Sequence, residues 1–228
     1  MDRFLSKRFG ISRTRICSLE REAAWLARDP AAVIAGVDEA GRGPLAGPVT
    51  AAAVVLPHDL PPELRNGLDD SKALSARRRE SLDALLRTTK GVRFAVGQAD
   101  VTEIDRINIL NATLQAMARA VAALGPDVTV ALIDGNRAPP LPPRIDVETM
   151  VGGDGLSLSI AAASIVAKVA RDRLMRELDE RFPGYGWADN MGYGTKAHMA
   201  ALARLGVTPH HRLSFAPVRN AALPKAGS

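Results

Sequence analysis

The chain has 228 residues, a formal net charge of +5 and 46% hydrophobic residues. This length suits one large domain with its own core, and the basic excess is compatible with a polyanionic partner such as nucleic acid. The single cysteine excludes an internal disulfide, and 4% aromatic residues are too few for a platform that stacks single-stranded bases. With no secretory signal and no run of about 18 apolar residues, we expect a cytoplasmic protein without membrane association.

The first half of the chain alternates short apolar runs with amphipathic stretches. Basic and apolar residues alternate over 12–29 and stop at Pro30, which predicts a basic amphipathic helix. Two β-prone runs, 33–37 and 49–56, flank a turn rich in glycine and proline, which predicts a hairpin. Further along we expect a helix over 75–86, a strand over 92–99 and a helix over 108–124.

The second half opens with a continuous apolar run at 128–133, typical of a strand buried on both faces. We then expect a strand over 145–151, the longest helix over 157–182, a loop over 183–194 and a helix over 195–205. This order predicts an α/β fold with a mixed sheet, antiparallel at first and then parallel, flanked by helices. We divide the chain into an N-terminal helical extension (1–30), a main domain with C-terminal helices (31–219) and a flexible tail (220–228).

Acidic residues stand where predicted strands end and where the longest helix begins. Asp38 and Glu39 close the first strand, Asp134 closes the strand at 128–133, and Asp154 precedes the longest helix. If the two strands are parallel neighbours, Asp38 and Asp134 lie side by side at the carboxyl edge, where open α/β sheets bind ligands. Gathered carboxylates repel one another unless cations are present, and oxygen ligands suit Mg²⁺ or Mn²⁺. With a polyanionic partner, this set predicts two-metal phosphodiester cleavage.

Each of these acids also has a plainer interpretation. Asp38 and Glu39 are equally compatible with solvated turn residues that form a surface ion pair with Arg42. An aspartate before a glycine, as at Asp134, is typical of a turn, and Asp154 suits the positive end of a helix dipole. Adjacent strand residues point to opposite faces, so Asp38 and Glu39 reach one metal only if the strand ends there, or if Glu39 acts from a bulge or through its carbonyl.

Other site signatures are absent from the sequence. The stretch Gly41–Pro44 does not fit a G-x-G-x-x-G fingerprint, because Pro44 and a second strand follow where a helix is required. There is no phosphate-binding G-x-x-x-x-G-K-[ST] motif and no G-x-S-x-G elbow. The adjacent histidines 210 and 211 have no thiolate nearby to complete a zinc site.

Six blocks of the chain together resemble a known family. They are Gly36–Val49 (GVDEAGRGPLAGPV), Asp70–Lys72 (DSK), Ile133–Asn136 (IDGN), Ser159–Val169 (SIAAASIVAKV), Gly192–Thr195 (GYGT) and His211–Phe215 (HRLSF). They occur in the same order as in the bacterial ribonuclease HII family and span about Val33 to Val218. The chain is similar to that family over nearly its whole length.

The resemblance implies a ribonuclease H-like fold with a C-terminal helical extension, in which 31–219 is the catalytic domain. It implies an endonuclease for the RNA strand of RNA–DNA hybrids that also incises 5′ of single ribonucleotides embedded in duplex DNA. Cleavage would use divalent Mn²⁺ or Mg²⁺ and leave 3′-hydroxyl and 5′-phosphate ends, as in ribonucleotide excision repair and DNA replication. The family's acidic residues fall on Asp38, Glu39, Asp134 and Asp154.

The resemblance also implies residues that contact the substrate. The family's glycine-arginine-glycine loop falls on Gly41, Arg42 and Gly43, whose backbone groups would read the ribose 2′-hydroxyl. Small residues allow that close approach. The family's junction-sensing tyrosine falls on Tyr193, which would pack against the sugar on the 3′ DNA side and is otherwise an ordinary loop tyrosine.

Three more residues fall on positions that would bind phosphate or support the site, namely Ser71, Lys72 and Lys168. Exposed lysines are otherwise mostly solvated surface. One departure concerns the segment before the longest helix, where the family often has Lys-Gly-Asp and this chain has a glycine at position 152. The missing lysine puts the role of Asp154 in doubt.

We therefore expect a monomeric, metal-dependent endoribonuclease in which Asp38, Glu39 and Asp134 bind the ions and Asp154 assists at a second ion or in product release. One alternative is a hybrid nuclease of the same fold that requires several consecutive ribonucleotides. Another is a non-catalytic module that binds hybrids, although an intact acidic set repels phosphate unless metals are present.

Overall fold

The computed structural model describes residues 17–69, 71 and 74–223. A five-stranded sheet in the order β3-β2-β1-β4-β5 forms its centre. The strands are β1 (Ile34–Ala40), β2 (Val49–Val55), β3 (Arg93–Ala99), β4 (Val130–Asp134) and β5 (Asp146–Met150). β1 pairs antiparallel with β2 and parallel with β4, so the predicted mixed sheet is confirmed.

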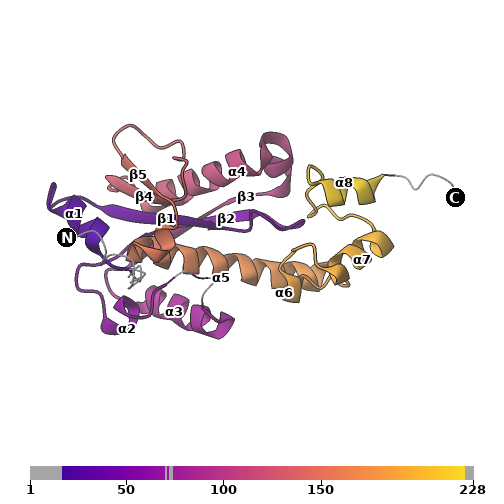
Figure 1. Ribbon diagram of the computed structural model, residues 1–228, viewed down its shortest axis with the longest axis horizontal. Helices are drawn as coiled ribbons and strands as arrows, with labels where there is room; N and C mark the ends of the chain where they lie inside the picture. The colour runs from indigo at the N-terminus through magenta and orange to yellow at the C-terminus, as the bar shows by residue number, and fades with distance from the viewer. Residues whose placement is uncertain (1–16, 70, 72–73, 224–228) are drawn as a thin grey trace, which may run out of the picture.

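Helices cover both faces of the sheet. They are α1 (Glu20–Leu26), α2 (Pro62–Arg65), α3 (Ala76–Thr88), α4 (Val101–Leu124), the short 3-10 helix η1 (Gly153–Gly155), α5 (Leu158–Arg181), α6 (Trp187–Asn190), α7 (Lys196–Leu205) and α8 (Ala216–Ala222). Figure 1 shows α4 on one face, α5 and α3 on the other, and α6 to α8 beyond the end of the sheet along α5. The structure thus has a three-layer body with a C-terminal helical lobe.

The strand β1 lies at the centre because small residues let α5 approach it closely. A Cβ added at Gly36 would lie 2.1 Å from the carbonyl carbon of Ser159, in the first turn of α5. The run Ala161–Ala163 continues this contact surface and is fully buried against β2 and its neighbours. Close packing of this kind leaves no room for an added methyl group. The N-terminal end of α5 is thereby held beside the middle of β1.

The helix α4 begins earlier than the predicted 108–124. Its first turn is capped by Asp100, whose side chain accepts a hydrogen bond from the N–H of Glu103 at 2.8 Å. The predicted start coincides with a kink at Asn108, which has φ of +67° and caps the second part through Asn111. By length and composition α4 could span a membrane, but its apolar residues pack in the core beside β2 and β3, as in a core helix.

The N-terminal helix is shorter than predicted in the described part of the chain. The prediction covered 12–29, whereas α1 spans Glu20–Leu26; residues 12–16 lie outside the description. Glu22 anchors α1 to α5, since its Oε1 accepts hydrogen bonds from the N–H and hydroxyl of Ser159 and the hydroxyl of Ser157. A carboxylate at a helix N-terminus is stabilised by the helix dipole. These hydrogen bonds therefore fix α1 against the N-terminal end of α5.

Candidate active site

The two acidic strand ends lie side by side, as their pairing requires. The β1–β4 ladder runs from Ile34 opposite Val130 to Val37 opposite Ile133, so Asp38 and Asp134 follow the last pair at the carboxyl edge. β1 itself continues to Ala40 through its antiparallel pairing with β2. The predicted end of this strand at residue 37 was therefore wrong, because only its β4 side becomes unpaired there.

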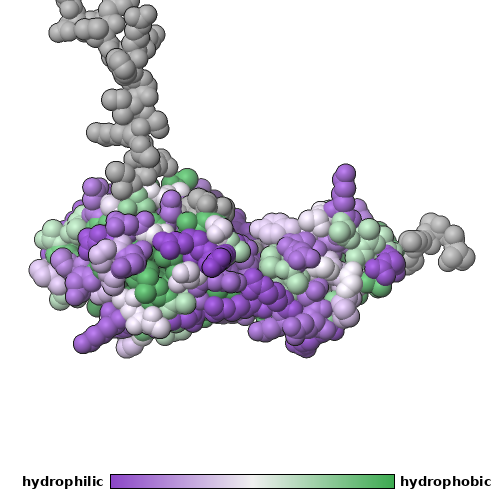
Figure 2. All heavy atoms as spheres, turned by 90° about the horizontal axis from the view of Figure 1, so that it is seen from below, coloured by the Kyte–Doolittle hydropathy of each residue, from purple (hydrophilic) through white to green (hydrophobic). Residues whose placement is uncertain are grey.

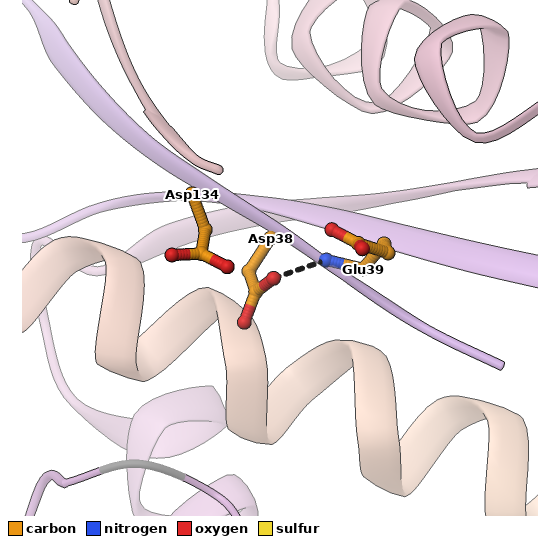
Figure 3. A group of neighbouring side chains, drawn as sticks. All are labelled: Asp38, Glu39 and Asp134. Atoms are coloured by element: carbon orange, nitrogen blue, oxygen red, sulfur yellow. Dashed lines mark hydrogen bonds between the residues drawn. The ribbon is translucent and has the colours of Figure 1, made fainter. Parts of the chain in front are cut away.

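Three carboxylates meet at this edge. One oxygen from each of Asp38, Glu39 and Asp134 lies within 4.8 Å of the others. Figure 3 shows the Asp38 and Asp134 side chains pointing to the same side, and the Glu39 carboxylate turned back toward them. The expectation that a regular strand keeps Asp38 and Glu39 apart was wrong, because the Glu39 side chain is long enough to bend back around the strand.

Asp38 is the most deeply buried of the three carboxylates. Its side chain is 4% exposed, and its Oδ1 accepts a hydrogen bond from the N–H of Glu39 at 2.6 Å. Burial and the nearby charges of Glu39 and Asp134 raise the pKa of Asp38 well above its usual range. Arg42 forms the surface ion pair expected in the plainer interpretation, but only with Glu39, at 3.3 Å.

The fourth predicted acid stands apart from these three. Asp154 is buried in η1 and its charge contributes to the raised pKa of Asp38, but it is not part of the three-carboxylate group. The neighbouring Gly153 instead donates its N–H to Oδ1 of Asp134 at 2.7 Å. Gly152 has φ of +68°, a conformation that favours glycine over the lysine frequent in the resembling family. The segment 152–154 therefore orients Asp134.

The donor set fits a hard divalent cation. All three side chains offer carboxylate oxygens, the ligands that Mg²⁺ and Mn²⁺ prefer. Among the residues that the structure describes, the cluster forms one ion pair, between Glu39 and the half-exposed Arg42. A buried carboxylate with a raised pKa beside two others is a site where a cation is stabilising.

The predicted substrate residues gather around a cavity beside the acids. This cavity, of about 380 Å³, is lined by Glu39, Ala40, Gly41, Arg42, Gly43, Ser71, Ser164, Lys168, Arg171 and Tyr193. Lys168 forms an ion pair with Asp172 on the next turn of α5, and burial lowers the pKa of its amine. Tyr193 is 47% exposed and its ring lies beside Gly43. Lys72, also predicted here, lies outside the described residues.

Two buried arginines near this cavity were missed by the sequence reasoning. Arg171 is 1% exposed and donates to the carbonyls of Pro48, Met191 and Ala46 at 3.0–3.1 Å. Arg212 is fully buried and donates to three further carbonyls of the loop after β1. Among the described residues neither forms an ion pair, and burial lowers the pKa of Arg171 to about 10 and that of Arg212 to about 9. Arg212 lies in the HRLSF block of the sequence, but that block does not indicate which carbonyls the arginine contacts.

Two neutral histidines connect the C-terminal lobe to Tyr193. His198 Nδ1 donates to the Tyr193 carbonyl at 2.9 Å, so its Nε2 accepts from Trp187 Nε1 at 3.0 Å. His211 Nδ1 accepts from the N–H of Thr208 at 3.0 Å, and its Nε2 lies 3.2 Å from Nε2 of His198. Burial lowers the pKa of His211 to about 4. This network holds the backbone of the Tyr193 loop against the lobe.

Figure 2 shows mostly hydrophilic side chains across the face on the side of α3 and α5, with a waist between the body and the C-terminal lobe. The loops 41–48, 191–193 and 210–212 are joined by main-chain hydrogen bonds at this junction, from Leu45 to Gly192 and from Gly47 to His210. The loop after β1, which carries the predicted substrate residues Gly41, Arg42 and Gly43, therefore belongs to the contact between body and lobe.

Comparison with known proteins agrees with this architecture. The family model described as ribonuclease HII matches residues 35–218. The ribonuclease HII of Rhodospirillum rubrum is 61% identical over 189 residues, covering 82% of this chain and 86% of the relative. That of Paramagnetospirillum magneticum is 59% identical over 187 residues, covering 82% and 91%.

Solved structures share the fold. The ribonuclease H2 of Pyrococcus horikoshii OT3 matches with a TM-score of 0.69 and 26% identity, covering 83% of this chain and 96% of that one. Bst-RNase HIII, solved in complex with Mn²⁺, matches with a TM-score of 0.66 and 20% identity, covering 84% and 69%. Together with the acidic edge of the sheet, these similarities establish that the chain belongs to the ribonuclease HII family, endonucleases that hydrolyse the RNA strand of RNA–DNA hybrids.

Proposed function

We propose that this chain incises 5′ of single ribonucleotides embedded in duplex DNA, in addition to cutting RNA–DNA hybrids, and leaves 3′-hydroxyl and 5′-phosphate ends. One observation carries the proposal. Glu39 lies in the three-carboxylate group and also lines the cavity formed by Gly41, Arg42 and Gly43. A ribose held at that loop therefore places its adjoining phosphate beside the carboxylates.

Asp38, Glu39 and Asp134 would hold the divalent cations, Mg²⁺ or Mn²⁺, with Asp154 assisting from η1. A bound cation supplies Lewis-acid activation of the phosphate and lowers the pKa of an attacking water. Asp38 provides the buried end of the cluster, and the hydrogen bond that its Oδ1 accepts from the Glu39 N–H restrains its carboxylate. Gly153 orients Asp134 through its N–H in the same way.

Substrate recognition would use the loop after β1. The residues Arg42 and Gly43 are exposed, and no hydrogen bond in the described part of the chain uses their N–H groups. These donors can bind the oxygen of a ribose 2′-hydroxyl, the group that distinguishes RNA from DNA. Tyr193 would pack against the sugar that follows, because its exposed ring borders the same cavity.

Phosphate contacts would come from Lys168 and Ser71, with Lys72 as a third. Lys168 lines the cavity, and the Ser71 hydroxyl is held 2.6 Å from that of Ser164 in α5. A positively charged contact of this kind strengthens binding to the phosphate backbone without reading its sequence. We further propose that the chain acts as a cytoplasmic monomer in ribonucleotide excision repair and replication, with 31–219 as the catalytic domain between the helical extension and the tail.

The test is cleavage of an end-labelled DNA duplex that carries one ribonucleotide, with Mg²⁺, with Mn²⁺ and with chelator. We expect metal-dependent incision on the 5′ side of the ribonucleotide, with a 3′-hydroxyl shown by extension with a polymerase. The matched control is the same duplex with a deoxyribonucleotide at that position, which should stay intact. Cutting of only long hybrids would favour the alternative nuclease of this fold, and binding without cutting would favour a hybrid-binding module.

A further inference from the structure

We propose that Arg212 is the positioning residue that sets the ribose-reading geometry of the loop after β1. Its guanidinium donates from Nη2 to the Gly41 carbonyl at 2.6 Å and from Nη1 to the Arg42 carbonyl at 2.8 Å. Its Nε donates to the Gly47 carbonyl at 2.9 Å. One rigid, planar side chain from the C-terminal lobe thus holds three carbonyls at both ends of the loop. This inference rests on the proposed function of that loop.

The geometry of the peptide bond connects these carbonyls to the substrate side. In a planar trans peptide the C=O of one residue and the N–H of the next point in opposite directions. The Gly41 carbonyl shares its peptide with the Arg42 N–H, and the Arg42 carbonyl shares its peptide with the Gly43 N–H. Because Arg212 holds both carbonyls, it directs both N–H groups away from itself. Arg212 is absent from the lining of the 380 Å³ cavity, whereas Gly41, Arg42 and Gly43 all line it.

The surroundings leave the loop little freedom to find this geometry without the arginine. Gly41 has φ of +94°, and a Cβ at this position would lie 2.0 Å from Nε of Arg171. The carbonyls that Arg212 binds are at least partly shielded from water, since Arg212 itself is fully buried. Without its donors, these carbonyls would rotate toward water or other partners, because unpaired buried carbonyls are costly. Rotation of either peptide moves its N–H group out of the ribose-reading position.

Arg212 therefore influences discrimination between ribose and deoxyribose more than affinity for DNA in general. It lines no part of the substrate cavity and so makes no direct phosphate contact there. General duplex affinity instead depends on exposed basic side chains. Loss of Arg212 should weaken the reading of the 2′-hydroxyl and leave the binding of all-DNA duplex nearly unchanged.

The experiment compares wild type, R212Q and R212K as full chains in Mn²⁺. For each, kcat/KM is measured on a duplex with one ribonucleotide, and Ki is measured for the all-DNA duplex of the same sequence as a competitor. We expect R212Q to lose about 30-fold in kcat/KM, with Ki within about threefold of wild type. The kcat/KM of R212K should lie between those of wild type and R212Q. The lysine ammonium keeps the positive charge but cannot donate to three carbonyls from one planar group.

A matched control separates positioning from a general loss of stability. Arg144 also donates to two carbonyls, those of Pro126 and Val128, but at a loop far along the chain from residues 41–48. R144Q should leave both kcat/KM and Ki unchanged. Thermal unfolding of each variant reports the folded fraction, and should R212Q not fold, R212K decides the test through the same two constants.

The outcomes are distinguishable from those of the proposed function. If the wild-type enzyme itself shows no preference for the ribonucleotide duplex, the proposed function fails. If the wild type shows the preference and folded Arg212 variants keep it within about twofold, the positioning role is overturned. An equal loss on kcat/KM and on all-DNA affinity would also overturn it, because that pattern indicates a general structural role.

Discussion

Two neighbouring regions of the molecule bury charged side chains in opposite ways. They are the acidic edge of the sheet and the loop 41–48, which Arg171 and Arg212 contact. At the edge, one carboxylate oxygen from each of Asp38, Glu39 and Asp134 lies within 4.8 Å of the others, and within the described ranges the one ion pair of this group is that of Glu39 with Arg42. At the loop, Arg171 and Arg212 are buried and form no ion pair with any residue that the structure describes, but their guanidinium groups donate to six backbone carbonyls. The first region costs stability until a cation arrives, whereas the second contributes to stability as folded.

In the proposed function, catalysis and substrate recognition therefore depend on different parts of the molecule. The acids come from the central strands β1 and β4 of the body, which are buried behind the edge. The loop is held by residues of α5 and of the segment before α8, so its shape depends on the C-terminal lobe. Substitutions in the two regions should therefore change stability with opposite signs.

The largest expected effect is on catalysis at the acidic edge. D134N should lower kcat on an RNA–DNA hybrid by at least about a thousandfold, or ~4 kcal/mol of activation free energy, because a neutral amide is a poor metal ligand. Single-turnover cleavage in Mn²⁺ measures it. The control D146N changes an exposed aspartate at the other end of the parallel ladder and should keep full activity. Substantial cleavage by D134N would remove this residue from the metal site.

Next in size is the loss of a buried arginine. R171M leaves the carbonyls of Ala46, Pro48 and Met191 without their donors, and we expect a loss of about 3 kcal/mol in the free energy of unfolding. Denaturant titration measures this loss. R176M is the control on the same helix, because Arg176 forms an exposed ion pair with Glu80, and this variant should lose no more than about 1 kcal/mol. Equal losses in the two variants would contradict the stabilising role of the carbonyl contacts.

The histidine network should make stability depend on pH in the acid range. The pKa of His211 is about 4 in the folded chain against 6.5 in an unfolded one, so the folded state binds fewer protons between these values. Stability is then complete above pH 6.5 and is lost as the pH falls toward 4, by up to about 3 kcal/mol.

Thermal unfolding at pH 7, 6, 5 and 4 measures this dependence. The variant H211Q should flatten the curve relative to wild type, whereas H58Q, which changes an exposed histidine, should follow the wild type. Identical slopes for H211Q and wild type would show that His211 is not the group responsible.

The smallest expected effect has the opposite sign to that of R171M. In chelator, D38N should raise the free energy of unfolding by about 1–2 kcal/mol, because it removes a buried charge that is repelled by its neighbours. The asparagine Oδ1 can still accept the hydrogen bond from the Glu39 N–H. Added Mn²⁺ should stabilise the wild type and not D38N. A destabilised D38N would show that the cluster does not repel itself as described.

The sequence predicted the acidic edge better than the loop, for a physical reason. The adjacency of Asp38 and Asp134 follows from two parallel strands that end together, and strand pairing confirmed it. The early start of α4 was missed, although Asp100 followed by Glu103 is a capping pattern. The kink at Asn108 explains why the apolar periodicity that predicted this helix began at residue 108.

The hydrogen bonds between Arg212 and the loop after β1 could not be predicted from the spacing of residues in the sequence. Its three partners lie 165 to 171 residues away and are backbone carbonyls, which carry no side-chain signal. The gathering of Glu39 with the other two acids also depends on a side chain that bends around its strand, which the alternation rule does not describe. The position of Asp154 in η1, outside the three-carboxylate group, likewise depends on a short turn that periodicity does not predict.

The most direct measurement is a crystal structure of the wild-type chain with Mn²⁺, with the ions located by anomalous scattering. We expect a peak about 2.0–2.3 Å from oxygens of Asp38, Glu39 and Asp134, and no such peak in D134N crystals treated identically. A peak held by Asp154 without these three carboxylates, or no peak at saturating Mn²⁺, would contradict the assignment of this edge as the metal site.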